Sequence, residues 1–381
     1  MSKRGENIWH RKDGRWEARY IRCYNGNRAV YGYLYAKSYA EVKAKQQAVV
    51  NNLAVKVSTT SEISFKDLLE AFICQKKYHV KESTLSNYSY KMNTYLIPYW
   101  GESNLKEINL LSIDKFVDYL FASRHLAPKT VKDIAGLFDS ILDFAYKNHF
   151  IEKKLKVPVP KISKRNVTIL LPEDQEHLIR YLWENMGYGE LGVLLSLMTG
   201  MRIGEICALK KNAFDFENCT VSVLYTLQRI RSNTENHTTK MILTSPKSEN
   251  SMRTIPLPKS FSMWLQHFCS SMEGDDYIIT GIKKYSEPRN YYKKYLRYLK
   301  ECGLDKQGYT FHTLRHTFAT EAIRRGIDAK SLSEILGHAS VKITLEKYVH
   351  PSFEQKLQEM EKFMLCHPFQ SYLQSSDAEQ P

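Results

Sequence analysis

Five short segments between residues 199 and 350 concentrate side chains that could hold or cleave a phosphodiester. In the first, Arg202 lies between Gly200 and Gly204 and is followed three residues later by Glu205. The planar guanidinium of an arginine offers paired donors that match a phosphate. A carboxylate such as Glu205 could instead neutralise the same arginine inside the fold. Both interpretations of Arg202 stay open on these residues alone.

Three further segments each contribute one candidate. Lys247 stands in a Pro-Lys-Ser turn between two expected strands, where a lysine is usually only solvated. His338 follows Gly337, a pairing more common at a helix end than in a ligand site. Tyr348 comes ten residues after His338 and is one of 25 tyrosines. None of the three indicates a function by itself.

The remaining segment, residues 312–316, carries two histidines around an arginine. His312 and Arg315 are three residues apart and therefore share one face of a helix. His312 and His316 are four apart, a spacing that can bind zinc, but the glutamate of a His-Glu-x-x-His site is absent. The seven cysteines are scattered and form no Cys-x-x-Cys pair. We therefore expect no metal site.

The order of these groups is more informative than any one of them. The segments read Thr-Gly-Met-Arg-Ile-Gly-Glu, Pro-Lys-Ser followed by Arg-Thr-Ile-Pro-Leu, His-Thr-Leu-Arg-His-Thr-Phe-Ala-Thr, Leu-Gly-His-Ala-Ser and Thr-Leu-Glu-Lys-Tyr-Val-His. In this order they resemble the motifs of the tyrosine recombinase, or phage integrase, family. The layout, with a basic β-rich region ahead of two larger regions, is similar to that of integrases from conjugative transposons and lambda-type phages.

The resemblance implies a site-specific DNA recombinase, an enzyme that cleaves and rejoins strands through a 3′-phosphotyrosine to integrate and excise a mobile element. The residues at the family's catalytic positions are Arg202, Lys247, His312, Arg315, His338 and the nucleophile Tyr348, with Glu205 orienting Arg202 from behind. Because the covalent ester conserves the energy of the phosphodiester, the resemblance implies no ATP, no metal and no other cofactor.

The resemblance also implies a role for each group. Arg202 and Arg315 would hold the nonbridging phosphate oxygens, and His338 would add a hydrogen bond to one of them. His312 would take part in acid–base transfer around the tyrosine. Lys247 would protonate the departing 5′ oxygen.

The implied partners are double-stranded DNA, at core and arm attachment sites, and three further copies of the chain in a DNA-bound homotetramer. An excisionase and a DNA-bending protein are further candidate partners. Two alternatives stay open: a type IB topoisomerase, which nicks and closes DNA with similar groups, and a non-catalytic DNA-binding regulator with the same fold.

The spacing of apolar residues along the chain predicts the helices and strands that must position these groups. It indicates a multidomain, mainly α-helical protein with small β elements. Residues 62–155 show helical spacing of apolar residues throughout and form the expected helical core-binding domain. Residues 156–166 form a linker, in which prolines interrupt any helix. Residues 167–381 form the mixed α/β catalytic domain, with strands expected over 220–228, 241–244 and 253–257 and a C-terminal tail.

The N-terminal region, residues 1–55, predicts a small three-stranded sheet with one helix, an arm-site DNA-binding domain. Asn25-Gly26-Asn27 separates two alternating stretches and is typical of a hairpin turn, and Ser38 with Glu41 indicates a helix start. Eleven Lys or Arg against four Asp or Glu make the region strongly basic. The candidate DNA-binding residues are Arg15, Arg19, Arg22 and Arg28 in this region, Lys154 before the linker and Lys156 at its first position.

The composition of all 381 residues agrees with a polyanionic partner. Lys and Arg number 55 against 41 Asp and Glu, a formal net charge of +14. No run approaches the ~18 apolar residues of a membrane span, and the polar N-terminus predicts no secretory signal. An odd number of scattered cysteines favours a reducing compartment. We therefore expect a protein of the bacterial cytoplasm, associated with the nucleoid and not with a membrane.

Overall fold

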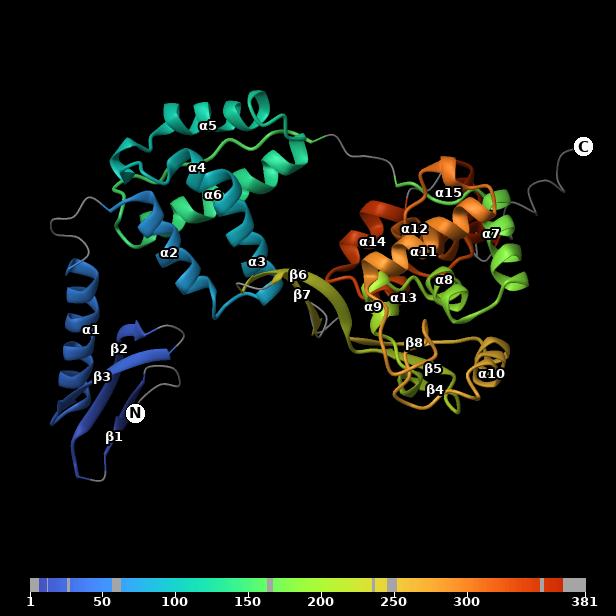
Figure 1. Ribbon diagram of the computed structural model, residues 1–381, viewed down its shortest axis with the longest axis horizontal. Helices are drawn as coiled ribbons and strands as arrows, with labels where there is room; N and C mark the ends of the chain where they lie inside the picture. The colour runs from blue at the N-terminus through green and yellow to red at the C-terminus, as the bar shows by residue number, and fades with distance from the viewer. Residues whose placement is uncertain are drawn as a thin grey trace, which may run out of the picture. The chain divides into compact units, whose positions relative to one another are not determined.

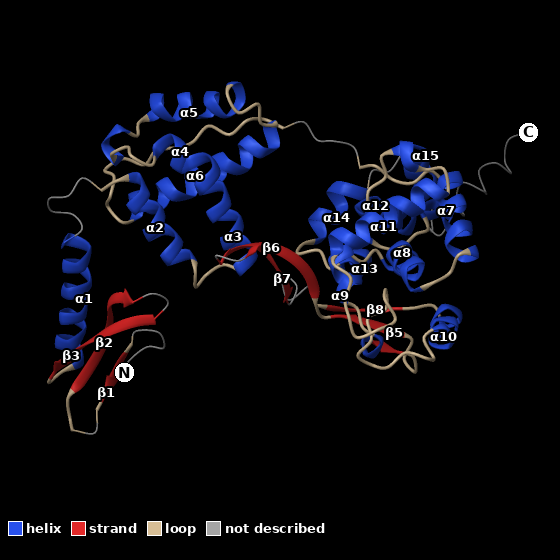
Figure 2. Ribbon diagram, viewed as in Figure 1, coloured by secondary structure: helices blue, strands red, loops and turns tan. Residues whose placement is uncertain are grey.

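The structure is a computed structural model that describes residues 7–11, 13–25, 28–56, 63–162, 167–234, 237–244, 252–349 and 353–365. It divides into two compact units, residues 1–163 and 164–381 (Figure 1). Helices make up most of both units and the sheets are small, as predicted (Figure 2). Among the described residues, no helix is both long enough and apolar enough to span a membrane.

The chain begins with the predicted three-stranded sheet and helix. Strands β1 (Ile8–His10), β2 (Trp16–Asn25) and β3 (Arg28–Ala36) pair antiparallel in that order, and α1 (Tyr39–Lys56) follows. Residues 26 and 27 of the expected hairpin turn lie outside the described residues.

Side-chain alternation gives this sheet two different faces. Ala18, Ala36 and Val42 are buried in one small core between the sheet and α1. Tyr31, Tyr33 and Tyr35 alternate with the inward positions of β3 and are 40%, 50% and 41% exposed, respectively. One face of the sheet is therefore covered by the helix and the other presents aromatic rings.

Within the same unit, the helices expected over residues 62–155 follow. These elements are α2 (Phe65–Lys76), α3 (Glu82–Lys91), a π-helical turn (Met92–Leu96), α4 (Ile97–Trp100), α5 (Leu110–Ala122) and α6 (Pro128–Lys147). Capping boxes at Ser64 and Asn109 start α2 and α5, and Pro128 occupies the first turn of α6. Val157, within the stretch predicted as a linker, is buried in this core, and its N–H donates to Asp139 Oδ1 at 3.0 Å.

The second unit combines helices with two small sheets. Its helices are α7 (Pro172–Glu184), α8 (Tyr188–Thr199), α9 (Ile203–Ala208), α10 (Lys259–Phe268), α11 (Pro288–Glu301), α12 (Phe311–Arg324), α13 (Ala329–Leu336), α14 (Val341–Tyr348) and α15 (Phe353–Leu365). Its strands are β4 (Phe214–Asp215), β5 (Thr220–Val223), β6 (Thr226–Thr234), β7 (His237–Thr244) and β8 (Arg253–Pro256).

One expected strand of this unit is wrong. Residues 220–228 form two strands, because the chain leaves the β4-β5-β8 sheet after Val223 and joins β7 in a separate hairpin from Thr226 onward. Leu224 and Tyr225, between the two strands, are 46% and 52% exposed. Their apolar character suggested continuity in a strand, but here they mark the point where the chain changes sheets.

Helix α8 is the centre of the second unit and leads directly to Arg202. Nine of its twelve residues are buried, and two glycines let α11 approach it closely. The Tyr291 hydroxyl donates to the carbonyl of Gly189 at 2.6 Å. A methyl group on Gly192 would lie 2.5 Å from Ile279 Cγ2 and also too close to the Tyr291 hydroxyl.

We therefore predict that Gly192→Ala lowers the free energy of unfolding of the second unit by about 1–3 kcal/mol, since the tight core must open to admit a methyl group. Gly136→Ala is the matched control, because Gly136 lies inside α6 with no atom within 4 Å of an added Cβ. This control should stabilise its own unit by ~0.5–1 kcal/mol through helix propensity. Urea unfolding followed by circular dichroism measures both, and a neutral Gly192→Ala variant would contradict the close packing of α8 and α11.

Candidate active site

Five of the six predicted catalytic residues gather in the second unit, from four neighbouring elements. Arg202 is the N-cap of α9, His312 and Arg315 lie in the first turns of α12, His338 follows α13, and Tyr348 ends α14. The sixth, Lys247, lies outside the described residues.

Glu205 fixes the position of Arg202. As the third residue of α9, its carboxylate accepts the Arg202 backbone N–H at 2.9 Å and a guanidinium N–H at 2.7 Å. The Glu205 side chain is 2% exposed, whereas that of Arg202 is 38% exposed. The carboxylate therefore holds Nη1 of Arg202 from inside, and Nη2 donates to the carbonyl of Gly337 at 3.4 Å, while part of the guanidinium stays exposed.

Arg253 is a member of this cluster that the sequence did not single out. It starts β8, is buried, and donates to both oxygens of Glu205, at 2.9 and 3.2 Å. Its Nε also donates to the carbonyl of Ile335 at 2.5 Å. Burial by itself would raise the pKa of Glu205, but Arg253 and Arg202 outweigh it and lower that pKa. One ionised carboxylate thus serves two arginines.

Backbone carbonyl groups at the ends of two helices bind the Arg315 side chain. It is 2% exposed, and its guanidinium donates to the carbonyls of Gly200 at 2.7 Å and Leu336 at 2.8 Å. These carbonyls close α8 and α13, where the last carbonyls have no partner within the helix and the helix dipole is negative. Gly200 and Gly337 adopt φ of 67° and 65°, the left-handed conformation that ends each helix there.

The charge of Arg315 survives its burial. Desolvation, with the neighbouring charge of Arg202, lowers the pKa of Arg315 to about 9. This value still leaves the guanidinium protonated at neutral pH, and its bonds to neutral carbonyls do not cancel its charge. An anion that reaches Arg315 therefore meets a full positive charge in a poorly hydrated environment.

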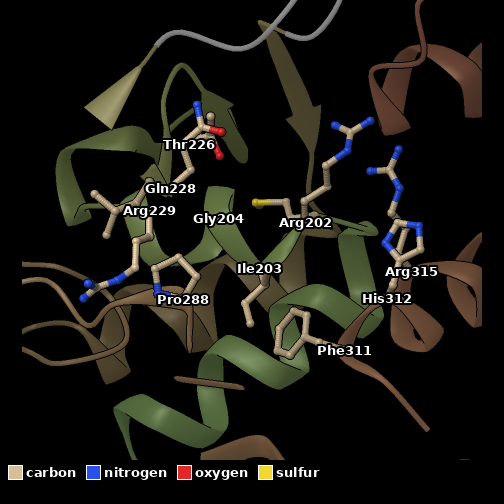
Figure 3. A pocket seen from close by; sticks show the side chains of 12 residues that line it. Arg202, Ile203, Gly204, Thr226, Gln228, Arg229, Pro288, Phe311, His312 and Arg315 are labelled. Carbon is tan, nitrogen blue, oxygen red and sulfur yellow. The ribbon is translucent and has the colours of Figure 1, made fainter. Parts of the chain in front are cut away.

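Arg202 and Arg315 border a pocket of about 390 Å³ (Figure 3). His312 lines the same pocket, and the opposite wall comes from β6 and the start of α11. In Figure 3 the side chains of the two arginines and His312 lie together at one side of the pocket, away from Arg229 and Pro288. The described walls therefore offer positive charge and hydrogen-bond donors, the requirements of a phosphate site.

Tyr348 is buried, 7% exposed, against apolar residues of α12 and α13. Its hydroxyl oxygen lies 2.7 Å from Nδ1 of His316. Burial raises the pKa of Tyr348 above its usual value, and this outweighs the opposite effect of Arg315 and Arg202. At neutral pH the side chain is therefore a phenol, which needs a proton acceptor before it can attack.

The histidines of the site are neutral as well. Partial burial, with the charges of Arg315 and other cations, lowers the pKa of His312 to about 4 and that of His338 to about 3. His338 Nδ1 lies 2.8 Å from Thr344 Oγ1, and its ring is parallel to that of Tyr348 at a centroid distance of 6.3 Å. One ring nitrogen of His338 is thus occupied by α14, and no hydrogen bond of Nε2 to another described residue is seen.

Sequence reasoning missed the role of His316, although its spacing from His312 was visible. The two rings do lie close together, with centroids 4.4 Å apart and an edge-to-face arrangement. No group of three His, Cys, Asp or Glu that could hold a metal occurs in the part of the chain that the structure describes. The ring of His316 instead contacts the hydroxyl of Tyr348.

The predicted DNA-binding residues belong to the first unit and are not part of this cluster. The guanidinium of Arg19 lies over the ring of Tyr31 at 4.3 Å, and that of Arg15 lies over Tyr35 at 5.5 Å. Arg22 and Arg28 belong to β2 and β3, but their side chains lie outside the described part.

The two candidate lysines differ in their surroundings. Lys154 forms an ion pair with Asp143 at 2.9 Å, whereas the exposed Lys156 lies in the irregular stretch that follows α6. An exposed ion pair of this kind contributes little to stability, so it can yield to a phosphate.

Comparison with known proteins agrees with this geometry. The profile of the phage integrase family matches residues 170–355, and that of the phage integrase N-terminal SAM-like domain matches residues 64–121. A tyrosine recombinase XerC-like protein of Caldanaerobacter subterraneus subsp. tengcongensis is 25% identical over 356 residues, which cover 86% of this chain and 90% of the relative.

Two solved structures share the fold. A Tn1549 transposon integrase, solved in complex with transposon right end DNA, has a TM-score of 0.65 at 21% identity and covers 79% of this chain and 99% of its own. A lambda integrase tetramer bound to a Holliday junction has a TM-score of 0.55 at 15% identity and covers 92% of this chain and 99% of its own. The phage integrase profile contains all the residues that the structure gathers, and the SAM-like profile matches a stretch that precedes it in the chain. The chain belongs to the phage integrase family of tyrosine recombinases.

Proposed function

We propose that this protein is a site-specific DNA recombinase, an integrase that inserts and excises a mobile element through a 3′-phosphotyrosine intermediate. The observation that carries the proposal is the convergence of Arg202 and Arg315 on one pocket, together with the buried phenol of Tyr348, whose pKa both arginines affect. Both arginines lie near enough to oppose the effect of burial on the pKa of that phenol.

The arginines provide electrostatic stabilisation. A phosphodiester is a monoanion, and attack by Tyr348 Oη places further negative charge on its nonbridging oxygens. Arg202 and Arg315 are already in position to donate to these oxygens, so their effect grows as the charge develops. His338, with Nε2 available, adds a hydrogen bond at the same phosphate.

Proton transfer completes the chemistry. Lys247 protonates the 5′ oxygen as its bond to phosphorus breaks, and His312, neutral and at the edge of the pocket, takes part in acid–base transfer. A 5′ hydroxyl from another strand can then attack the phosphotyrosine and release Tyr348. The reaction needs neither ATP nor a metal, because the phosphotyrosine conserves the energy of the bond that was cut.

The partner is double-stranded DNA bound at two kinds of site. The helical domain and the catalytic unit hold the core site, with Lys154 and Lys156 near the backbone phosphates. The sheet of β1, β2 and β3, with Arg15, Arg19, Arg22 and Arg28, binds separate arm sites.

Recombination of two duplexes cuts four strands, which requires four active sites and hence a homotetramer on DNA. An excisionase and a DNA-bending protein would bias the direction of the reaction. The cysteines that the structure describes are free thiols, which agrees with a reducing compartment. We place the enzyme in the bacterial cytoplasm at the nucleoid.

The first prediction concerns the nucleophile. Tyr348→Phe should abolish the covalent adduct on a nicked suicide duplex that carries the attachment site, because no other oxygen replaces the phenol. Tyr285→Phe, which removes a phenol oxygen from a tyrosine that is 39% exposed, serves as the control and should react as wild type. Gel electrophoresis of the denatured products detects the adduct. An adduct on Tyr348→Phe would show that the assignment of Tyr348 as the nucleophile is wrong. A separate assay of strand exchange between paired sites would distinguish a recombinase from a topoisomerase.

A second prediction concerns Arg202. Arg202→Lys keeps the charge but loses the planar pair of donors. DNA binding should stay close to wild type, while the cleavage rate constant should fall by about 10²–10³-fold. Arg180→Lys, on the exposed surface of α7, should change neither quantity. Equal losses of binding and cleavage would contradict a role in the transition state.

A third prediction concerns the N-terminal domain. Deleting residues 1–55 should weaken binding to arm sites by at least about tenfold, since it removes the basic sheet and its phosphate contacts. Cleavage of a core-site suicide duplex should persist. Mobility-shift and cleavage assays on separate arm and core duplexes measure the two effects, and loss of core cleavage would overturn the domain assignment.

A further inference from the structure

His316 is the residue bonded to the reacting atom of the nucleophile, yet the motif positions assign it no part in catalysis. It follows Arg315 on α12 and faces the last residue of α14. Its Nδ1 lies 2.7 Å from Tyr348 Oη, the distance of a well-formed hydrogen bond. Since Oη must lose its proton when it bonds to phosphorus, the group that contacts Oη is placed to receive that proton.

The surroundings of His316 keep its Nδ1 able to accept the phenol proton. Partial burial, followed by the charges of His312, Lys347 and Arg315, lowers the pKa of His316 to about 4. The ring is therefore neutral at pH 7, and Tyr348 is a phenol because burial raises its pKa. With both partners neutral, the tautomer that carries its proton on Nε2 leaves the Nδ1 lone pair to accept the phenol O–H.

A bound phosphate would raise the proton affinity of His316, as catalysis requires. The cations that oppose protonation of His316 include Arg315, which the proposed reaction pairs with the phosphate. Partial neutralisation of that charge raises the proton affinity of His316 when the scissile phosphate is in place. The base therefore gains strength with substrate bound and stays weak in the free enzyme.

A pocket next to His316 gives space in which the transferred proton can be stabilised. A second pocket, of about 330 Å³, is lined by His312, His316 and Lys347 together with residues that precede α7 and start α12. His312 lines both this pocket and the phosphate pocket. The imidazolium formed at His316 can thus be hydrated from this second pocket.

We propose that His316 is a catalytic residue that accepts the proton of Tyr348 during cleavage and returns it during rejoining. In the forward step, Oη bonds to phosphorus, its proton passes to Nδ1 of His316, and the bond from phosphorus to the 5′ oxygen breaks. The 5′ oxygen receives its proton from Lys247, the general acid of the proposed function on which this inference rests. In the reverse step an incoming 5′ hydroxyl gives its proton back to Lys247, and His316 reprotonates Oη as Tyr348 leaves.

The test is single-turnover cleavage of the nicked suicide duplex by the full chain, from pH 6 to 9. His316→Gln keeps a hydrogen-bond acceptor of similar reach but cannot hold a proton, and His316→Ala removes both properties. His267→Gln, an exposed histidine of α10, is the matched control. Mobility shifts and thermal melting establish that each variant binds DNA and folds.

We expect both His316 variants to cleave about 10²–10⁴-fold more slowly than wild type at pH 7, with Gln no better than Ala. Their rates should rise about tenfold per pH unit from 7 to 9, because hydroxide must then remove the phenol proton, whereas the wild-type rate should be flat. A substrate with sulfur in place of the bridging 5′ oxygen, which needs no acid, should rescue Lys247→Ala but not His316→Gln.

Three results would overturn the inference while leaving the proposed function intact. A His316→Gln variant near the wild-type rate with a flat pH profile would mean that His316 only positions the ring. A His316→Ala variant faster than wild type would mean that the bond restrains Tyr348. Rescue of His316→Gln by the sulfur substrate would move its action to the leaving group. Absence of any adduct with wild type would instead overturn the proposed function, and this inference with it.

Discussion

Positive charge that the protein's own carboxylates only partly neutralise is the constraint on which the catalytic unit depends. Arg202, Arg253 and Arg315 converge, and Glu205 pairs with the first two of them. Arg315 is held instead by carbonyl oxygens where α8 and α13 end, and Arg253 also donates to the end of α13. Carbonyl dipoles satisfy the donors but leave the net charge in place, so the folded site keeps an excess of positive charge that a phosphate can neutralise.

The same excess charge governs the proton chemistry around the phosphate pocket. It helps to keep His312, His316 and His338 unprotonated at neutral pH, while burial keeps Tyr348 a phenol. A cluster of neutral imidazoles next to a phenol is ready to move protons but weakly basic until an anion arrives. In the proposed reaction, binding the phosphate and activating the nucleophile are therefore linked by electrostatics.

Much of the architecture was predictable because it depends on local periodicity. The start of α6 at Pro128, the capping boxes of α2 and α5, and the alternation that gives the N-terminal sheet its two faces are properties of neighbouring residues. Contacts between residues far apart in the sequence decide which sheet a strand joins. Residues 220–228 show the consequence. Their apolar, β-branched composition is equally compatible with one long strand or with two, and only pairing with β7 and β8 decides between them.

The sequence by itself determined the family and the order of Arg202, His312, Arg315, His338 and Tyr348, because a reaction at phosphorus demands these side-chain types whatever the details of packing. Tertiary structure alone decided their partners. Arg253 and His316 lie within two of the quoted motifs, but nothing local indicated their partners: one starts an ordinary strand and the other lies one helical turn beyond His312. Their roles arise from contacts across 48 and 32 residues of chain, with Glu205 and Tyr348. Such contacts depend on how α9, β8, α12 and α14 pack together, which no spacing within one element can reveal.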